Sequence, residues 1–373
     1  MKMAATKTAF QSVDVESLPR TDLARLGEER LIAGQVIRRA AGSSLYRHLW
    51  PRWPRRLPAV RDRRDLQRLP FTSRWELRDA QSRWPMERIA CAPVYAWASS
   101  HSQGETRTWM PFGKKDIELV QGLLDRLARK AQVKRNAVVL AVTPLAPRLT
   151  NALPYLWLTA DMAETKMKLE FIVTSMYMLG KNNWPEFALR RQPDILLCRP
   201  GDALILAEHF PKAAGRPAAR PRDVLPNLKT GIFFGEPLAP SRNAIVDAYG
   251  LEPYDLYLSA EHPGMNCDCR FHQGIHFWMD TCIPEIIPAA ELNREQSEPG
   301  YRPRAVFLDC AAPECRGELV VTTFAEAMPL VRYRSGDIVR LIANAPCPCG
   351  STHPRIQVLG RHSQIPASEG SPS

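Results

Sequence analysis

KTGIFFGEP at 229–237 and EPYDLYLSAE at 252–261 are the two neighbouring pieces of sequence that decide the fold. Residues 230–234 and 253–258 have the short apolar pattern of strands; the first ends in a Gly-Glu-Pro turn and the second in a polar loop that carries Glu261. Two strands that end side by side form a ligand crevice at the carboxyl edge of an α/β sheet. The two pieces therefore predict an α/β fold in which the turn lies close to a flat ring and Glu261 holds a cation.

Alternating helix and strand patterns surround these pieces. Residues 116–131 carry their apolar side chains on one face, which predicts an amphipathic helix, and residues 137–142 are continuously apolar, which predicts a central strand. Ser73 and Glu76 have the spacing of a capping box at the start of a helix at 74–82. The other predicted elements are helices at 23–39, 202–209 and 241–249 and strands at 94–97 and 195–198.

The composition is that of a globular protein large enough for one big domain or two, with 373 residues of which 45% are hydrophobic. No apolar run reaches the roughly 20 residues that a membrane helix needs, and the first 17 residues lack the apolar stretch of a secretory signal. We therefore expect a cytoplasmic protein. Nine cysteines in such a chain argue against a disulfide scaffold and favour a metal site.

The net charge of +11 favours anionic partners, which leaves nucleic acid, ATP and coenzyme A (CoA) as alternatives. The positive charge is concentrated in residues 47–88, where a solvated basic surface is the simpler interpretation. No helix-turn-helix, RNP-type or zinc-finger pattern supports binding to nucleic acid, which we consider unlikely.

Three short motifs carry a resemblance to a known family. Gly235-Glu236-Pro237, residues 257–261 and the YRSGD piece at 333–337 resemble core motifs of the adenylate-forming enzymes, and in particular of the phenylacetate–CoA ligase-like branch. Further similarities recur in the same order from about residue 45 to residue 361, among them LPFTS at 69–73. An ordered set of this kind is much more specific than a single Gly-Glu-Pro.

The resemblance implies the large N-terminal domain of these enzymes, with layered sheets, helices and a distorted β-barrel subdomain. It divides the chain into an N-terminal helical segment at 1–45, the large domain at 46–361, and a truncated hinge and tail at 362–373. The small C-terminal lid domain, which supplies a catalytic lysine in the family, is expected to be absent. Catalysis without that lysine, a partner protein that supplies the lid, and loss of catalysis are the three alternatives; a homodimer is also possible.

The same resemblance implies a role for each residue of the nucleotide site. Gly235, Glu236 and Pro237 would form the turn beneath adenine, and Tyr257 would stack on the ring. Glu261 would coordinate Mg²⁺ on the phosphates, because magnesium prefers carboxylate and water oxygens. Asp337 would accept hydrogen bonds from both ribose hydroxyls, and Arg361 would reach the ribose or a phosphate.

The family's phosphate loop corresponds to residues 98–106. Backbone N–H groups and hydroxyls of such a loop hold the ATP phosphates, and the residues that fit this role are Ser99, Ser100, Ser102 and Gly104. His101, Gln103 and Glu105 depart from the family pattern, and Glu105 places a negative charge where the family has a lysine. The alternative is therefore a serine-rich loop that no longer binds a triphosphate.

The implied chemistry is attack of a carboxylate on the α-phosphate of ATP, which gives an acyl-adenylate, followed by transfer of the acyl group to CoA, an amine or another acceptor. The acid would be aromatic or small, and candidate walls for its pocket are Tyr155, Trp157, Phe171 and Tyr177, although aromatic residues at such spacing more often belong to the plain core. The alternative function is a catalytically degenerate relative that binds a nucleotide or acyl ligand, or acts as a partner protein.

Cysteines and histidines gather in two segments far apart in the sequence. Two Cys-x-Cys units with nearby histidines are typical of a tetrahedral zinc site, and some members of the family hold a structural zinc between the matching segments. The predicted ligands are Cys269, His276, Cys347 and Cys349, with Cys267, His272 and His353 as alternates. Four protein ligands leave no open position, so the zinc would be structural; free buried cysteines are the alternative.

Overall fold

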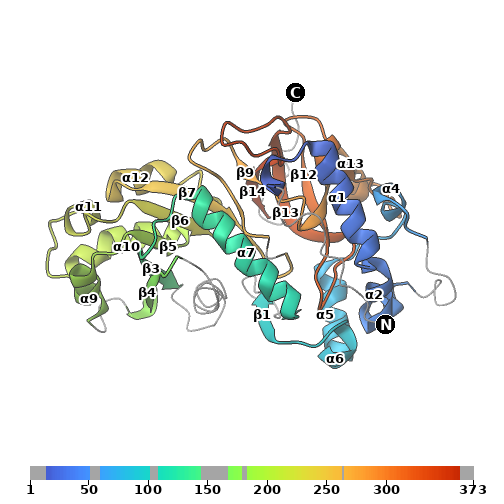
Figure 1. Ribbon diagram of the computed structural model, residues 1–373, viewed down its shortest axis with the longest axis horizontal. Coiled ribbons are helices and arrows are strands. Elements are labelled where there is room, and N and C mark those ends of the chain that lie inside the picture. The colour runs from blue at the N-terminus through green and yellow to red at the C-terminus, as the bar shows by residue number, and fades with distance from the viewer. Residues whose placement is uncertain are drawn as a thin grey trace, which may run out of the picture.

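The computed structural model describes residues 14–50, 59–100, 108–143, 167–178, 183–262 and 264–361, which form one hydrogen-bonded sheet of twelve strands and a separate two-stranded hairpin. One half of the sheet is parallel and the other half is antiparallel. Figure 1 shows these halves as two neighbouring lobes with a long helix between them.

The parallel half contains the strand pair on which the sequence prediction depends. In spatial order its strands are β7 (Glu252–Tyr257), β6 (Thr230–Phe234), β5 (Ile195–Cys198), β3 (Val138–Thr143) and β4 (Glu170–Ser175). The strand expected to be central, β3, lies one place from the edge, because β4 pairs with its outer side. Its continuous apolar run reflects burial on both faces, since Val139 belongs to one core cluster and Leu140 to the other.

Helices cover both faces of the parallel half (Figure 1). On one face lie α9 (Trp184–Arg191), α10 (Pro200–Ala213), α11 (Pro221–Val224) and α12 (Arg242–Tyr249). The predicted amphipathic helix is α7 (Lys114–Lys130), which buries Val120, Leu124 and Leu127 in the core of the other face. The helices predicted at 202–209 and 241–249 are thus α10 and α12.

The antiparallel half brings the C-terminal part of the chain beside β7. Outward from β7 its strands are β8 (Asn266–Cys267), β9 (Ile275–His276), β14 (Arg355–Arg361), β13 (Tyr333–Ala343), β12 (Arg316–Thr323), β10 (Cys282–Pro288) and β11 (Val306–Phe307). The helix α13 (Ala289–Ser297) and the 3-10 turn η3 (Leu308–Cys310) pack against this half, and η2 (Met176–Met178) follows β4. The short pair β8 and β9 is the link between the two halves.

The N-terminal region wraps around the antiparallel half (Figure 1). It contains η1 (Val15–Ser17), α1 (Arg20–Ala33), α2 (Val36–Gly42), α3 (Ser44–Leu49), α4 (Arg63–Leu66), α5 (Arg74–Arg83) and α6 (Met86–Ile89). The single helix predicted at 23–39 is wrong: the left-handed backbone of Gln35, at φ +47°, separates α1 from α2. The helix predicted at 74–82 is α5, and it begins with the expected capping box of Ser73 and Glu76.

The hairpin of β1 (Ala96–Ser100) and β2 (Thr108–Phe112) lies between α5 and α7 in the sequence. Its first strand begins two residues after the start of the predicted strand at 94–97. Ser100 pairs with Thr108 at the end of the ladder where the connecting segment joins the two strands, so the predicted phosphate loop at 98–106 begins within this ladder.

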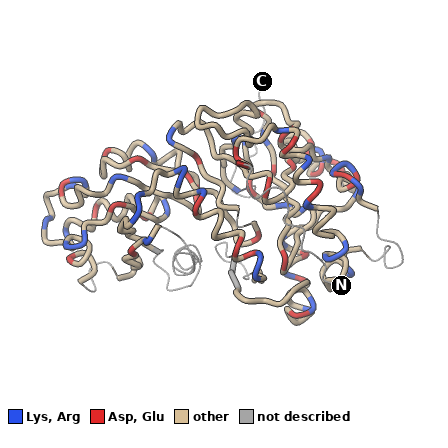
Figure 2. The backbone as a smooth tube through the Cα atoms, viewed as in Figure 1, with Lys and Arg blue, Asp and Glu red and all other residues tan. Residues whose placement is uncertain are grey.

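Charges of both signs are interspersed along the backbone (Figure 2). In the basic stretch at 47–88, Arg63 pairs with Asp309 and Arg74 pairs with Glu261, so part of its charge is neutralised internally. All nine cysteines are free thiols. Within the described ranges, none of the helices has both the length and the apolar character needed to cross a membrane.

Candidate active site and metal centre

The ends of β6 and β7 form the centre of the candidate nucleotide site. Phe234 and Leu256 are paired at the last step of the parallel ladder, so the turn at Gly235 and the loop toward Glu261 leave the sheet side by side. Gly235 has φ +85°, a conformation that residues with a Cβ rarely adopt. The Glu236 carboxylate accepts a hydrogen bond from the backbone N–H of Gly201 at the start of α10, where a negative charge is favourable. The turn is therefore fixed to α10 by Glu236.

Asp337 lies beside β7 and contacts two other predicted site residues. The Tyr257 hydroxyl donates a hydrogen bond of 2.7 Å to Asp337 Oδ2, and Arg361 Nε lies 3.3 Å from Oδ1. Asp337 and Arg361 are also partners in the ladder between β13 and β14. Burial raises the pKa of Asp337, although Arg361 and the Tyr257 hydroxyl oppose the rise. Tyr257, Asp337 and Arg361 thus form one hydrogen-bonded group; stacking of the Tyr257 ring on adenine stays a prediction.

Glu261 is buried among donors from three other elements. Arg74 Nη2, at the start of α5, lies 3.0 Å from Glu261 Oε1. The hydroxyls of Thr108, on β2, and Tyr333, on β13, each donate to the same oxygen at 3.4 Å. Burial raises the pKa of Tyr333 well above its ordinary value, so its hydroxyl is a neutral donor. The predicted magnesium ligand is a carboxylate that already has a cationic partner.

The sequence prediction missed two of these partners. Arg74 follows the capping residue Ser73 in the early stretch that resembles the family, which is a signal that could have identified it. Thr108 carries no such signal, because nothing in its sequence neighbours distinguishes it from other strand residues. Both come to Glu261 only through the packing of α5 and β2.

The predicted phosphate loop is described in part. Ser99 and Ser100 are in β1, paired with Trp109 and Thr108, whereas Ser102 and Gly104 lie outside the described residues. His101, Gln103 and Glu105 also lie outside them. Thr108, which pairs with Ser100 in the ladder, contacts the predicted magnesium ligand Glu261.

A cavity of about 30 Å³ lies behind Glu261, and it is lined mainly by apolar side chains, including Met110, Phe112, Leu119 and Met328. Roughly 10–15 Å³ admits one water molecule and about 150 Å³ accommodates benzene, so this cavity is too small for an aromatic ring. Of the predicted pocket walls, Tyr155 and Trp157 lie outside the described residues. Phe171 is half-buried against the core and Tyr177 is 49% exposed, so neither faces this cavity.

The four predicted zinc ligands come together although they are far apart in the sequence. The ligand atoms of Cys269, His276, Cys347 and Cys349 all lie within 4.8 Å of one another. The sulfurs of Cys269 and Cys347 are 3.7 Å apart, and Cys349 Sγ is 3.5 Å from His276 Nε2. Around a tetrahedral zinc ion, with bonds of about 2.3 Å to sulfur and about 2.05 Å to nitrogen, these two separations are roughly 3.8 and 3.6 Å. The donor set fits zinc in chemistry and in spacing.

The protonation of the cluster also fits a cation. Hydrogen bonds from Cys269 and from the His276 ring hold the pKa of the Cys349 thiol well below its ordinary value, whereas the contact with Cys349 and burial raise the pKa of Cys269. His276 Nδ1 is buried without a hydrogen-bond partner among the described residues, and the ring is held by stacking on Trp278 at 5.6 Å between centres. These contacts favour the thiolate form of Cys349, and the stacking on Trp278 orients the imidazole of His276.

The three alternate ligands have other contacts. His272 forms ion pairs with Asp268 and Glu252. His353 Nδ1 accepts a hydrogen bond of 3.1 Å from the backbone of Met279. Cys267 is fully buried in the core and does not belong to the group of four. The ligand set predicted first is the one that the fold assembles.

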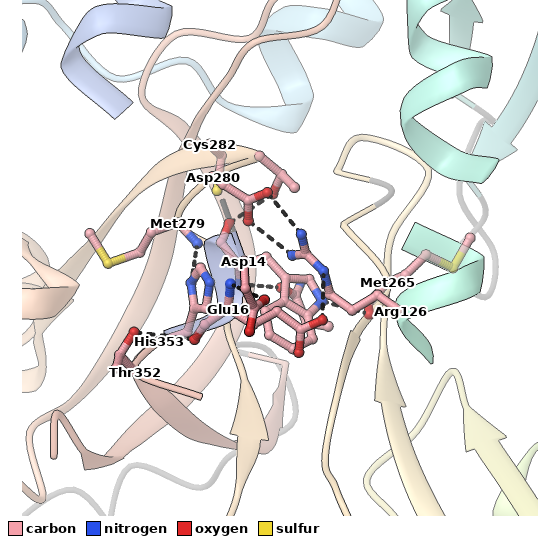
Figure 3. A network of polar contacts seen from close by, with 12 residues as sticks. Asp14, Glu16, Arg126, Met265, Met279, Asp280, Cys282, Thr352 and His353 are labelled. Carbon is pink, nitrogen blue, oxygen red and sulfur yellow. Dashed lines mark hydrogen bonds and ion pairs between the residues drawn. The ribbon is translucent and has the colours of Figure 1, made fainter. Parts of the chain in front are cut away.

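A network of buried ionic contacts lies next to the cluster (Figure 3). Arg126, on α7, forms two hydrogen bonds of 3.0 Å with the Asp280 carboxylate and lies over the Trp278 ring. Burial disfavours ionisation of Asp280, but Arg126 more than compensates and lowers its pKa to about 2. Arg126 also approaches Glu16, from the N-terminal turn η1, at 3.7 Å. The network thus joins the N-terminal segment, α7 and the segment before β10.

Comparison with known proteins gives two kinds of similarity, although no family model matches the chain. It is 28% identical over 361 residues to a phenylacetate–coenzyme A ligase of Thermus thermophilus, with 93% of this chain and 72% of that protein covered. It is 26% identical over 293 residues to the phenylacetate–coenzyme A ligase of Escherichia coli, with 76% of this chain and 59% of that protein covered. The chain thus spans less than two thirds of the second relative.

A solved structure of 2-hydroxyisobutyryl-CoA ligase, in the postadenylation state with 2-HIB-AMP, superposes with a TM-score of 0.74 at 20% identity. The match covers 94% of this chain and 70% of that protein. At this level of identity the match is one of fold, and it confirms the predicted fold class.

Proposed function

We propose that the chain belongs to the phenylacetate–coenzyme A ligase-like branch of the adenylate-forming enzymes, which its similarity to these ligases supports, and that it activates a small carboxylic acid with ATP. A carboxylate oxygen of the acid attacks the α-phosphorus, the bond to the bridging oxygen breaks, and pyrophosphate leaves. The product is an acyl-adenylate, from which the thiol of CoA or an amine displaces AMP. The observation that carries the proposal is the meeting of Asp337, Tyr257 and Glu261 beside the ends of β6 and β7.

Nucleotide binding in this proposal uses the two sides of the crevice. The turn from Gly235 to Pro237 lies beneath the adenine, where the φ of +85° at Gly235 brings backbone close to the ring. Asp337 accepts the ribose hydroxyls with the lone pairs that Tyr257 and Arg361 leave available. The contribution of these residues is to position the nucleotide, which lowers the barrier without any covalent step on the protein.

The phosphates lie toward Glu261 in the same proposal. Mg²⁺, when bound, neutralises the charge of the pyrophosphate leaving group, and the Glu261 carboxylate would hold it. Arg74, 3.0 Å from Glu261, adds a positive charge near the phosphates. Hydroxyl and backbone N–H groups of Ser99, Ser100, Ser102 and Gly104 would complete the phosphate site in this scheme.

An ATP–pyrophosphate exchange assay over aryl and short-chain acids tests the proposal. We expect exchange with at least one acid, and a loss of about 100-fold in Asp337→Asn, because the amide has one accepting oxygen in place of two and lacks the charge that strengthens these hydrogen bonds. Asp247→Asn, on the exposed side of α12, is the matched control and keeps the wild-type rate. No exchange with any acid, together with no ATP binding in calorimetry, contradicts the proposal.

A second candidate function is a nucleotide- or acyl-binding protein without catalysis. The observation that favours it is that both key carboxylates already have partners within the protein. Asp337 contacts Tyr257 and Arg361, and Glu261 pairs with Arg74. Such a protein binds ATP in calorimetry but gives no exchange with any acid. The two candidates are thus separated by the same pair of measurements.

We also propose that Cys269, His276, Cys347 and Cys349 hold a structural zinc ion, on the strength of their spacing. Metal analysis of the purified protein is expected to give about one zinc per chain, and Cys347→Ser to give much less. Less than a tenth of a zinc per wild-type chain contradicts the assignment. We infer a cytoplasmic location as well, because metal-bound thiolates and free cysteines persist in a reducing compartment.

A further inference from the structure

Lys130 lies between the cysteine–histidine cluster and the N-terminal segment. Its Nζ is 3.4 Å from Cys349 Sγ and 2.7 Å from Glu16 Oε2, and its side chain is only 10% exposed. We propose that Lys130, held in place by Glu16, is a positioning residue of the metal centre, and that metal retention depends on the N-terminal segment for this reason. The inference rests on the proposed zinc site.

The charge of the ligand set explains why a cation is needed there. A zinc ion of charge +2 with three thiolates and a neutral imidazole has a net charge of −1. The ammonium group of Lys130 donates a hydrogen bond to the Cys349 sulfur and so places a positive charge against this anionic ligand set in a partly buried position. Donors to ligand atoms of this kind orient the ligand and stabilise the charged form, and their loss typically weakens metal binding by about 10–100-fold.

Glu16 fixes the position of the lysine. Its carboxylate lies within ion-pair distance of three cations of α7, Arg126, Arg129 and Lys130. The backbone of the same segment is also bound to the loop that follows Cys349, because Thr352 N donates to Glu16 O at 2.9 Å and the Thr352 hydroxyl donates to the carbonyls of Glu16 and Leu18. Figure 3 shows Glu16, Thr352 and His353 gathered at this place. The segment is therefore attached both to the lysine and to the ligand-bearing loop.

Solvent reaches this arrangement through a pocket of about 520 Å³. Its walls include Glu16, Arg129, Lys130, Cys269, Arg270 and Cys349. Metal leaving the cluster toward solvent on this side passes Lys130. Binding of the metal and docking of residues 14–18 should then be linked, and linkage is reciprocal: whatever loosens the segment weakens metal binding, and removal of the metal loosens the segment.

The first test compares zinc release from variants of the zinc-loaded protein into a chelating dye. We expect Lys130→Met to release zinc about tenfold faster than the wild type. Lys130→Arg keeps a donor at the sulfur and stays within about threefold of the wild type, and Glu16→Gln lies between these two. The matched control is Arg129→Met, because Arg129 also pairs with Glu16 but is 63% exposed and contacts none of the cysteine sulfurs in the described part of the chain.

The second test needs no variant. Hydrogen exchange of the wild-type protein is measured with zinc bound and after chelation, and we expect faster exchange at residues 14–18 only after chelation. Two results overturn the inference but leave the zinc site intact. One is equally fast zinc release from Lys130→Met and Arg129→Met, and the other is hydrogen exchange at residues 14–18 that does not change on chelation. Wild-type protein without zinc overturns the metal site itself and this inference with it.

Discussion

The hydroxyl of Tyr257 donates a 2.7 Å hydrogen bond to Oδ2 of Asp337, which joins the end of β7 to the middle of the sheet's antiparallel half. The two residues are 80 positions apart in the sequence, and each belongs to a different short motif. Because Asp337 is only 7% exposed, this hydrogen bond orients the carboxylate before any ligand arrives. A preoriented carboxylate accepts two sugar hydroxyls at a lower entropic cost than a mobile one.

Tyr257→Phe tests this orientation. A hydrogen bond to a buried charged group contributes roughly 1.5–3 kcal/mol, so we expect a loss of stability in that range and a several-fold weaker affinity for ATP. Urea denaturation and calorimetry measure the two effects. Tyr301→Phe is the matched control, since Tyr301 donates a hydrogen bond of the same length to the half-exposed Glu291 away from the crevice. Equal effects of the two substitutions on ATP affinity would contradict a special role for Tyr257.

The buried pair of Arg74 and Glu261 should show strong coupling in a double-mutant cycle. Their side chains are 14% and 3% exposed, and removal of one partner from such a pair leaves a buried charge, which costs about 3–5 kcal/mol. We expect each of Arg74→Met and Glu261→Gln to be strongly destabilising, and the double variant to be much less so than their sum. The exposed pair Arg294 and Glu298 serves as control, and its coupling should be far weaker because solvent screens the two charges.

Stability should fall in mild acid because of His262. Burial lowers the pKa of this histidine from 6.5 to about 4. Between these two pH values the unfolded chain binds a proton at His262 and the folded chain does not. The stability contribution is complete above pH 6.5 and is lost as the pH falls toward 4, by on the order of 2 kcal/mol at pH 5. His262→Gln should flatten the dependence of the free energy of unfolding on pH between 7 and 5. His209→Gln, at an exposed position, should leave the slope unchanged.

Removal of metal should lower the unfolding temperature. The cluster links Cys269, which precedes β9, and His276, the last residue of β9, to the loop before β14, so a bound ion crosslinks segments that are about 80 residues apart. Chelation should therefore lower the unfolding temperature by roughly 5 °C or more, as measured by calorimetry. Cys310→Ser, at an exposed cysteine outside the cluster, should unfold at the wild-type temperature and respond to chelation in the same way. A Cys347→Ser protein that still loses stability on chelation would contradict the assignment.

Local patterns were sufficient where short-range chemistry decides the structure. The apolar run at 230–234 became β6 with the same bounds, and Ser73 and Glu76 formed the expected capping box. The helix expected at 23–39 was wrong because its pattern did not reveal a left-handed residue, Gln35, which only the packing of α1 and α2 stabilises. The position of β3 near the edge was not predictable either, since burial on both faces gives the same apolar run at any place in a covered sheet.

The sequence by itself determined the family likeness, the two strand ends with their turn, and the identity of the four cysteine and histidine side chains that fit a metal. Each of these features depends only on the type of the residues and their order along the chain, both of which the sequence gives. Only the tertiary structure decided that Glu236 caps α10, that Tyr257 holds Asp337, and that Arg74 and Lys130 stand beside Glu261 and Cys349. The physical reason is that these contacts join residues from 35 to more than 200 positions apart in the sequence. Which of these residues meet in space depends on the order in which the strands pair in the mixed sheet.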